Sequence, residues 1–138
     1  TRRNFVYIPQ GNSLVSGTIR DNLLMGNPDA TDEEMREALR IACAEYVYEL
    51  PDGIDSPISE RGGGLSEGQA QRIAVARSIL RPGSILILDE VTSALDEVTE
   101  KEMLRRLTQS KIGKTLIFVT HRPAVMDYCT QVLRIEKP

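Results

Sequence analysis

The residues of this chain best suited to chemistry are polar side chains that each follow a short apolar run. Asp89 and Glu90 follow one such run, and His121, the only histidine of the chain, follows another. Gln10 comes shortly after a third run near the N-terminus. Apolar runs of this length are typical of strands buried in a parallel sheet, where ligands bind at the edge formed by the carboxyl ends of the strands. The spacing therefore predicts one site at that edge.

These residue types suit phosphate chemistry. Mg²⁺ prefers oxygen ligands and keeps several waters, so a strand-end carboxylate such as Asp89 is what a Mg²⁺-nucleotide site requires. The adjacent Glu90 could orient an attacking water, and the imidazole of His121 could donate a hydrogen bond to a phosphate oxygen. An Asp-Glu pair also ends many unrelated strands, and a lone histidine is often structural, so the surrounding sequence has to decide.

A second chemical feature is the segment 62–69, which reads GGGLSEGQ. Ser66 and Gln69 have the spacing of a capping box, so a helix should begin here with its unpaired N–H groups and positive dipole end facing an anion. The alternative is a loop joined to a well-capped helix, in which Ser66 is an N-cap only. Gly68 lets the backbone approach a phosphate, so we expect Gly68→Asp to block that approach with little loss of stability.

The elements that must position these residues follow from apolar spacing. We predict strands over 5–8, 85–88, 115–120 and 132–135. We predict helices that begin near Gly17, after Thr31, after Ser66 and at Pro123, with another through Val98–Leu107. The Thr31 helix should run on to Tyr46, and 51–64 should be loop. The strand–helix–strand order of 85–120 makes the fold class α/β with a parallel sheet.

Composition limits the function classes. The chain has 138 residues, 41% apolar and 27% charged, which fits one globular domain. A net charge of −3 and 4% aromatic residues argue against a nucleic-acid partner and an anionic membrane surface. Two distant cysteines and one histidine argue against a disulfide framework or zinc site. No apolar run has the length of a membrane span.

The motifs occur in the order of an ABC ATPase domain. Gln10 is followed by Leu65-Ser66-Glu67-Gly68-Gln69, then the run ending in Asp89-Glu90, then Ser93-Ala94-Leu95-Asp96, then His121. The chain thus resembles the ATP-binding domain of ABC transporters, C-terminal part from the Q-loop onward. The resemblance implies a P-loop NTPase-like core with a helical subdomain at 11–80, residues 1–10 and 81–138 belonging to the α/β core, and the cofactors ATP and Mg²⁺.

The same resemblance assigns roles. Gln10 would be the Q-loop residue that senses Mg²⁺ and the transport partner, Asp89 the Walker B carboxylate that supports the metal, Glu90 the catalytic base and His121 the switch histidine. Leu65, Ser66, Glu67, Gly68 and Gln69 would form the nucleotide-contacting signature motif, and Asp96 would close the D-loop. The family usually has glycine where this chain has Glu67, which adds a negative charge near a phosphate site.

The family's phosphate-binding loop, G-x-x-x-x-G-K-S/T, does not occur in this sequence. Gly113-Lys114-Thr115 imitates its end, but Thr108 stands where the first glycine should be, and the segment precedes a strand instead of following one. We therefore expect the isolated chain to bind MgATP weakly and to hydrolyse none of it.

The resemblance also implies partners. A second ABC ATPase domain would complete a head-to-tail dimer, and transmembrane domains would dock through the Q-loop region and the X-loop at 60–62, on the cytoplasmic face of the membrane. Segments 11–23 and 60–62 are similar to those of exporters. Two alternatives stay open: a non-transport ABC ATPase that acts on DNA or ribosomes, and an interaction module without catalysis.

Overall fold

The computed structural model describes residues 5–9, 13–110 and 112–133, with the side chain of Arg61 left out. Gln10, a predicted site residue, lies outside these ranges. Half of the predicted last strand, residues 134 and 135, lies outside as well. Its two described residues, Val132 and Leu133, form no strand, so that prediction is wrong for them.

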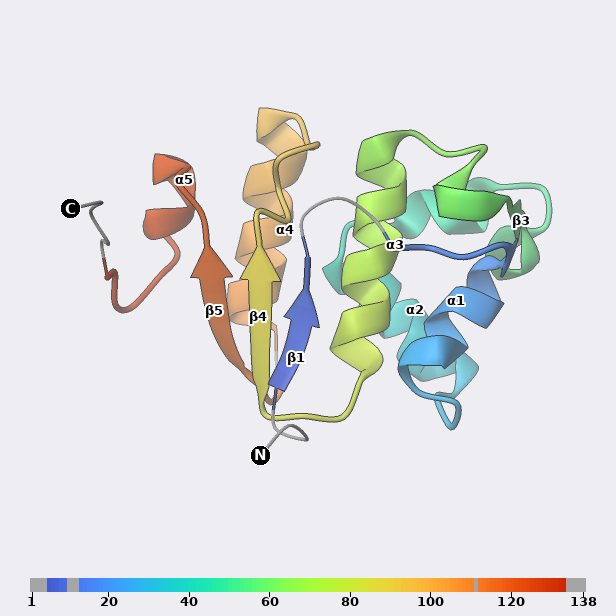
Figure 1. The fold of residues 1–138 in the computed structure, drawn as a ribbon, viewed down its shortest axis with the longest axis horizontal. Helices are drawn as coiled ribbons and strands as arrows, with labels where there is room; N and C mark the ends of the chain where they lie inside the picture. Colours follow the sequence, from blue (N-terminus) through green and yellow to red (C-terminus); the bar gives the residue numbers. More distant parts are fainter. Residues whose placement is uncertain (1–4, 10–12, 111, 134–138) are drawn as a thin grey trace.

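A three-stranded parallel sheet forms one side of the molecule (Figure 1). Its strands are β1 (Phe5–Ile8), β4 (Ile85–Asp89) and β5 (Thr115–Val119), in the order β1-β4-β5. Helix α4 (Glu97–Gln109) connects β4 to β5 and lies behind the sheet in this view. The strands expected over 5–8, 85–88 and 115–120 and the α/β fold class are confirmed.

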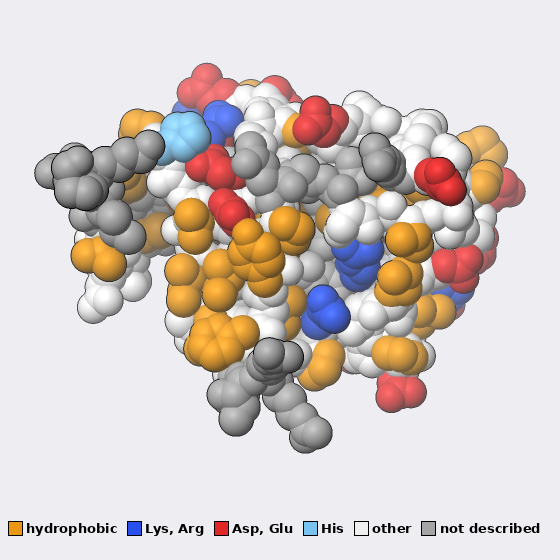
Figure 2. Space-filling view, viewed as in Figure 1, with side chains coloured by type: hydrophobic (Ala, Val, Ile, Leu, Met, Phe, Trp, Pro, Cys, Tyr) orange, Lys and Arg blue, Asp and Glu red, His pale blue; other side chains and the backbone are white. Residues whose placement is uncertain are grey.

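The two faces of the sheet differ in burial. Val6 and Ile8 of β1 and Leu86 and Leu88 of β4 alternate with more exposed neighbours and are almost fully buried. The opposite face carries apolar side chains that remain open, and Figure 2 shows them gathered over the strands. The most exposed are Phe5, Tyr7, Ile117 and Val119. Within the described part of the chain this face of the sheet is therefore uncovered, although parallel sheets usually have both faces covered.

Three capped helices form the other side of the molecule: α1 (Ile19–Gly26), α2 (Asp32–Ile41) and α3 (Glu67–Leu80). Each begins with a capping box, in which a Ser or Thr hydroxyl and the side chain three residues later accept each other's backbone N–H. The predicted helix starts after Thr31 and Ser66 are confirmed. Pro123 likewise begins the short α5 (Pro123–Met126).

Two local predictions are wrong. Helix α2 ends at Ile41 and does not reach Tyr46, because Cys43 adopts a left-handed backbone with φ 58°; the 3₁₀ helix η2 (Glu45–Glu49) follows. Residues 51–64 are not all loop. They contain the 3₁₀ helices η3 (Gly53–Asp55) and η4 (Glu60–Gly62) and the strand β3 (Pro57–Ile58), which pairs antiparallel with β2 (Gly17–Thr18). Pairing with a distant segment orders this stretch.

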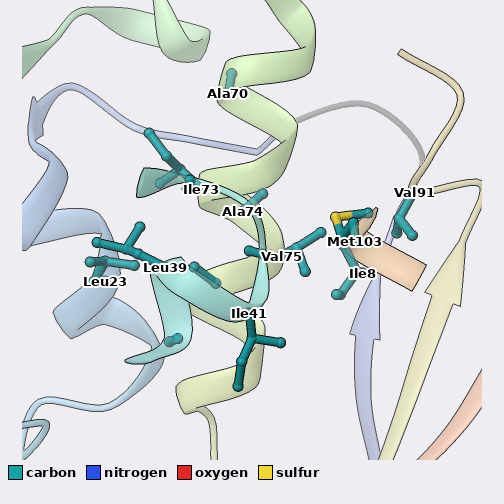
Figure 3. Packing of buried hydrophobic residues seen from close by; sticks show 14 of the residues in the cluster. Ile8, Leu23, Leu39, Ile41, Ala70, Ile73, Ala74, Val75, Val91 and Met103 are labelled. Carbon is teal, nitrogen blue, oxygen red and sulfur yellow. The ribbon is translucent and has the colours of Figure 1, made fainter. Parts of the chain in front are cut away.

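Helix α3 lies between the sheet and the other helices and is buried on both sides (Figure 3). Val75 points toward Ile8 and Met103, whereas Ile73 lies on the side of Leu23 and Leu39. A helix with apolar contacts on opposite sides has no single apolar stripe, which agrees with the apolar residues of α3 being spread over more than one face. This placement brings the N-terminus of α3 next to the sheet edge that carries the site.

Candidate active site

Glu90 and His121 meet at the carboxyl edge of the sheet. Because β4 and β5 are parallel neighbours, with Asp89 in register with Val119, the chain leaves both strands at the same edge. His121 Nδ1 lies 2.8 Å from Glu90 Oε1. The Glu90 side chain is 13% exposed and that of His121 is 88% exposed. The structure thus holds a nearly buried carboxylate under an accessible imidazole.

The backbone of Glu90 is in an unusual conformation. Its φ is 53°, in the left-handed region, which costs a non-glycine residue about 1–3 kcal/mol and is concentrated at functional sites. Three hydrogen bonds hold it: Glu90 N donates to Val119 O at 2.9 Å, and Glu90 O accepts from Ser93 N at 3.3 Å and from Gln71 Nε2 at 3.4 Å. Gln71, a buried residue of α3, was missed in the sequence, where its only signal was an amide in an apolar helix.

Asp89 lies on the uncovered face of the sheet at the end of β4. Its Oδ2 accepts a hydrogen bond of 2.6 Å from the hydroxyl of Tyr7, and this bond raises the pKa of Tyr7. Tyr7 was also missed; its signal was a hydroxyl within an apolar strand. The contact fixes the direction of the Asp89 carboxylate at the end of β4.

Asp89 fits a Mg²⁺ ion bound mainly by water and phosphate. In the described ranges no group of three or more His, Cys, Asp and Glu side chains could enclose a metal. Mg²⁺ in nucleotide sites is usually held by one or two carboxylates together with phosphate oxygens, so the strand-end carboxylate of Asp89 meets that need without a protein cage. Lys114 is not available for phosphate, because its ammonium donates to Arg81 O at 2.7 Å and Gly83 O at 2.5 Å.

The start of α3 is a complete capping box. Gln69 N donates to Ser66 Oγ at 3.0 Å, and Ser66 N donates to Gln69 Oε1 at 2.9 Å. Ser66 and Glu67 are exposed, whereas Leu65 packs against the core. The first turn is thus exposed at Ser66 and Glu67, and the N–H groups that a helix leaves unpaired in its first turn are donors suited to an anion.

Gly68 lies so close to the turn that follows β4 that a larger residue would not fit without a shift. A Cβ at this position would lie 2.8 Å from Ala94 O, a backbone atom that cannot easily move away. The expectation that Gly68→Asp would leave stability nearly unchanged is therefore wrong. Through Gly68 and Gln71, helix α3 contacts the chain segment 90–95 directly.

Asp96 ends that segment as the N-cap of α4. Its Oδ2 accepts a hydrogen bond from Thr99 N at 3.2 Å, and the hydrogen bonds from Thr99 hold the pKa of Asp96 below its usual value. Its carboxylate is exposed, so the described contacts assign it a capping role.

These features define an α/β protein with a candidate phosphate-hydrolysing site at the carboxyl edge of a parallel sheet. The sequence model of the ABC transporter family matches residues 1–93, and the chain belongs to this family. The resemblance found in the motifs is thus confirmed.

The relatives are of the exporter type. The chain is 40% identical over 137 residues to a putative export ATP-binding/permease protein of Rickettsia felis, covering 99% of this chain and 24% of that protein. It is 43% identical over 122 residues to ABC transporter B family member 1 of Arabidopsis thaliana, covering 88% of this chain and 10% of that protein. A bacterial Atm1-family ABC exporter solved with ATP bound matches with TM-score 0.83 and 34% identity, over 91% of this chain and 22% of that one.

The chain spans about a quarter of the length of the first of these relatives, at 24%. Within the described ranges, no helix is both long and apolar enough to cross a bilayer. The structural match identifies the α/β fold of this chain as a fragment of the ABC ATPase fold.

Proposed function

We propose that this chain is part of the ATP-hydrolysing domain of an ABC exporter, in which the conversion of ATP and water to ADP and phosphate powers export across a membrane. The observation that carries the proposal is the Glu90–His121 contact of 2.8 Å at the carboxyl edge of the sheet. Exporter relatives favour this function over that of a non-transport ABC ATPase.

In the proposed reaction Glu90 orients the attacking water and accepts its proton, as a carboxylate with restricted motion can. His121, exposed above it, donates a hydrogen bond to a γ-phosphate oxygen. Asp89, oriented by Tyr7, would support Mg²⁺, which when bound supplies positive charge that offsets the phosphate charge. Gln10 would sense that ion and the transport partner.

The exposed start of α3 supports a second subunit as partner. We infer a head-to-tail dimer in which Ser66, Gly68 and the first N–H groups of α3 face ATP held by the other ATPase domain. Leu65 packs into the core and Gln69 completes the cap, so both hold that turn in place. Transmembrane domains would dock on segments 11–23 and 60–62, with the chain on the cytoplasmic face.

The test is ATP turnover by the full-length protein that contains this chain. Glu90→Gln keeps the shape of the side chain but removes the base, so ATP binding should persist while turnover falls by about 10²–10⁴, the usual contribution of a general base. Glu97→Gln is the matched control, because Glu97 is exposed on α4 and forms an ion pair with Lys101 at 3.4 Å. Unchanged turnover in Glu90→Gln would make Glu90 a structural residue.

A further inference from the structure

An ion pair between a buried carboxylate and a half-buried guanidinium lies next to the strand ends that carry the candidate site. Glu100 of α4 is only 1% exposed, and a glutamate is almost never buried to that degree unless it is paired. Its partner is Arg122: Nε lies 2.7 Å from Oε2 and Nη2 lies 3.0 Å from Oε1. The guanidinium is thus hydrogen-bonded to Oε1 and in close ionic contact with Oε2, which has no hydrogen bond of its own among the described residues.

Arg122 is the residue directly after His121, and its contacts extend to both strand ends. Its backbone N donates to Thr120 Oγ1 at 3.0 Å, which shapes the turn leaving β5. Its Nη1 donates to Thr92 O at 3.4 Å, in the turn that follows Glu90. One side chain thus connects the exit of β5, the exit of β4 and helix α4.

We propose that Arg122 and Glu100 are positioning residues that hold His121 against Glu90, an inference that rests on the function proposed above. The imidazole of His121 is 88% exposed, so packing around its ring does not set its direction. Its direction depends instead on the backbone on either side, and the ion pair fixes that backbone relative to the turn carrying Glu90. A misplacement of about 1 Å in such a site can cost about 100-fold in rate.

A purely structural role predicts something different. Replacing both members of a buried ion pair by apolar residues of similar volume often leaves stability unchanged or raises it. The double variant Glu100→Leu/Arg122→Met should therefore stay folded while releasing Thr92 O and the His121 turn. Arg122→Lys is a second probe, since lysine keeps the charge but lacks the planar group that reaches both Glu100 and Thr92 O.

The experiment measures kcat and KM for MgATP in the full-length protein, with melting temperature as a check on folding. We expect the double variant to lower kcat about 10- to 100-fold with KM unchanged, and Arg122→Lys to lower it less. Arg105→Met, which breaks the exposed ion pair with Glu102 on the same helix, is the control and should change neither.

A double-mutant cycle with His121→Ala gives the decisive readout. If Arg122 and Glu100 act through His121, adding their substitutions to His121→Ala lowers kcat no further. Unchanged kcat in a folded variant would overturn the positioning proposal, and so would a loss that adds in full to that of His121→Ala. If the double variant does not fold, the same cycle is measured with Arg122→Lys. Retained turnover in Glu90→Gln would instead reject the proposed function, so the two failures are distinguishable.

Discussion

His121 Nδ1 lies 2.8 Å from Glu90 Oε1, so this contact occupies one of the two imidazole nitrogens. An ionised carboxylate only accepts hydrogen bonds, so a hydrogen bond from His121 to Glu90 would need the proton on Nδ1, and a neutral ring would then have an acceptor at Nε2. His121 can therefore donate to phosphate either as an imidazolium or after leaving Glu90. Its high exposure permits that exchange, and nucleotide binding is the event we expect to trigger it.

Ser66 allows its role as a helix cap to be separated from the proposed phosphate contact. Ser66→Ala removes the cap, at a cost of about 0.5–2 kcal/mol, and should speed hydrogen exchange in the first turn of α3. Ser66→Asp keeps a good cap but adds a negative charge facing phosphate, so exchange should stay slow while ATP turnover falls. Thr31→Ala removes the equivalent cap of α2 and should leave turnover unchanged. Normal turnover in Ser66→Asp would argue that Ser66 is a cap only.

Gly68→Ala tests the contact between α3 and the turn after β4. A methyl group 2.8 Å from Ala94 O forces the two backbones apart, and overpacking of this kind costs about 1–3 kcal/mol. Hydrogen exchange should therefore rise in both 67–72 and 90–96 of the full-length protein. Glu67→Ala, one residue earlier and exposed, is the control. Wild-type exchange in Gly68→Ala would mean that the two segments separate at no cost.

The sequence was most informative where structure is local. Strands β1, β4 and β5 are continuous apolar runs, and the starts of α2 and α3 are capping boxes contained within four residues, so each could be predicted. The meeting of Glu90 with His121 was also predictable, because parallel strands end at a common edge.

What could not be predicted depends on contacts between distant segments. Tyr7 reaches Asp89 across the sheet, and Arg122 reaches Glu100 from another element, yet neither pair leaves a periodic pattern. The sequence explains Gly68 by the approach of the backbone to a phosphate, and it does not reveal that Ala94 O also lies where a side chain would start. The early end of α2 at Cys43 arises from a backbone turn that no glycine marks.

Asp96 should make helix α4 sensitive to acid. Its hydrogen bonds depress the pKa in the folded state below the ordinary value near 3.8, so the cap stabilises the fold above that value and loses this effect as pH falls through the folded-state pKa. Asp96→Asn keeps a good cap that does not titrate, and Asp96→Ala has none. Acid titrations followed by circular dichroism should show a less steep loss of helix for Asn than for wild type. An identical titration would count against this role.

Complementation between two copies of the full-length protein tests the central claim most directly. If Glu90 of one copy and Ser66 of the other form one composite site, an assembly with Glu90→Gln on one copy and Ser66→Asp on the other carries both defects in the same site and keeps the second site intact. An assembly with both changes on one copy carries one defect in each site. We predict that ATP turnover is retained in the first assembly and lost in the second; the reverse result would contradict a site shared between subunits.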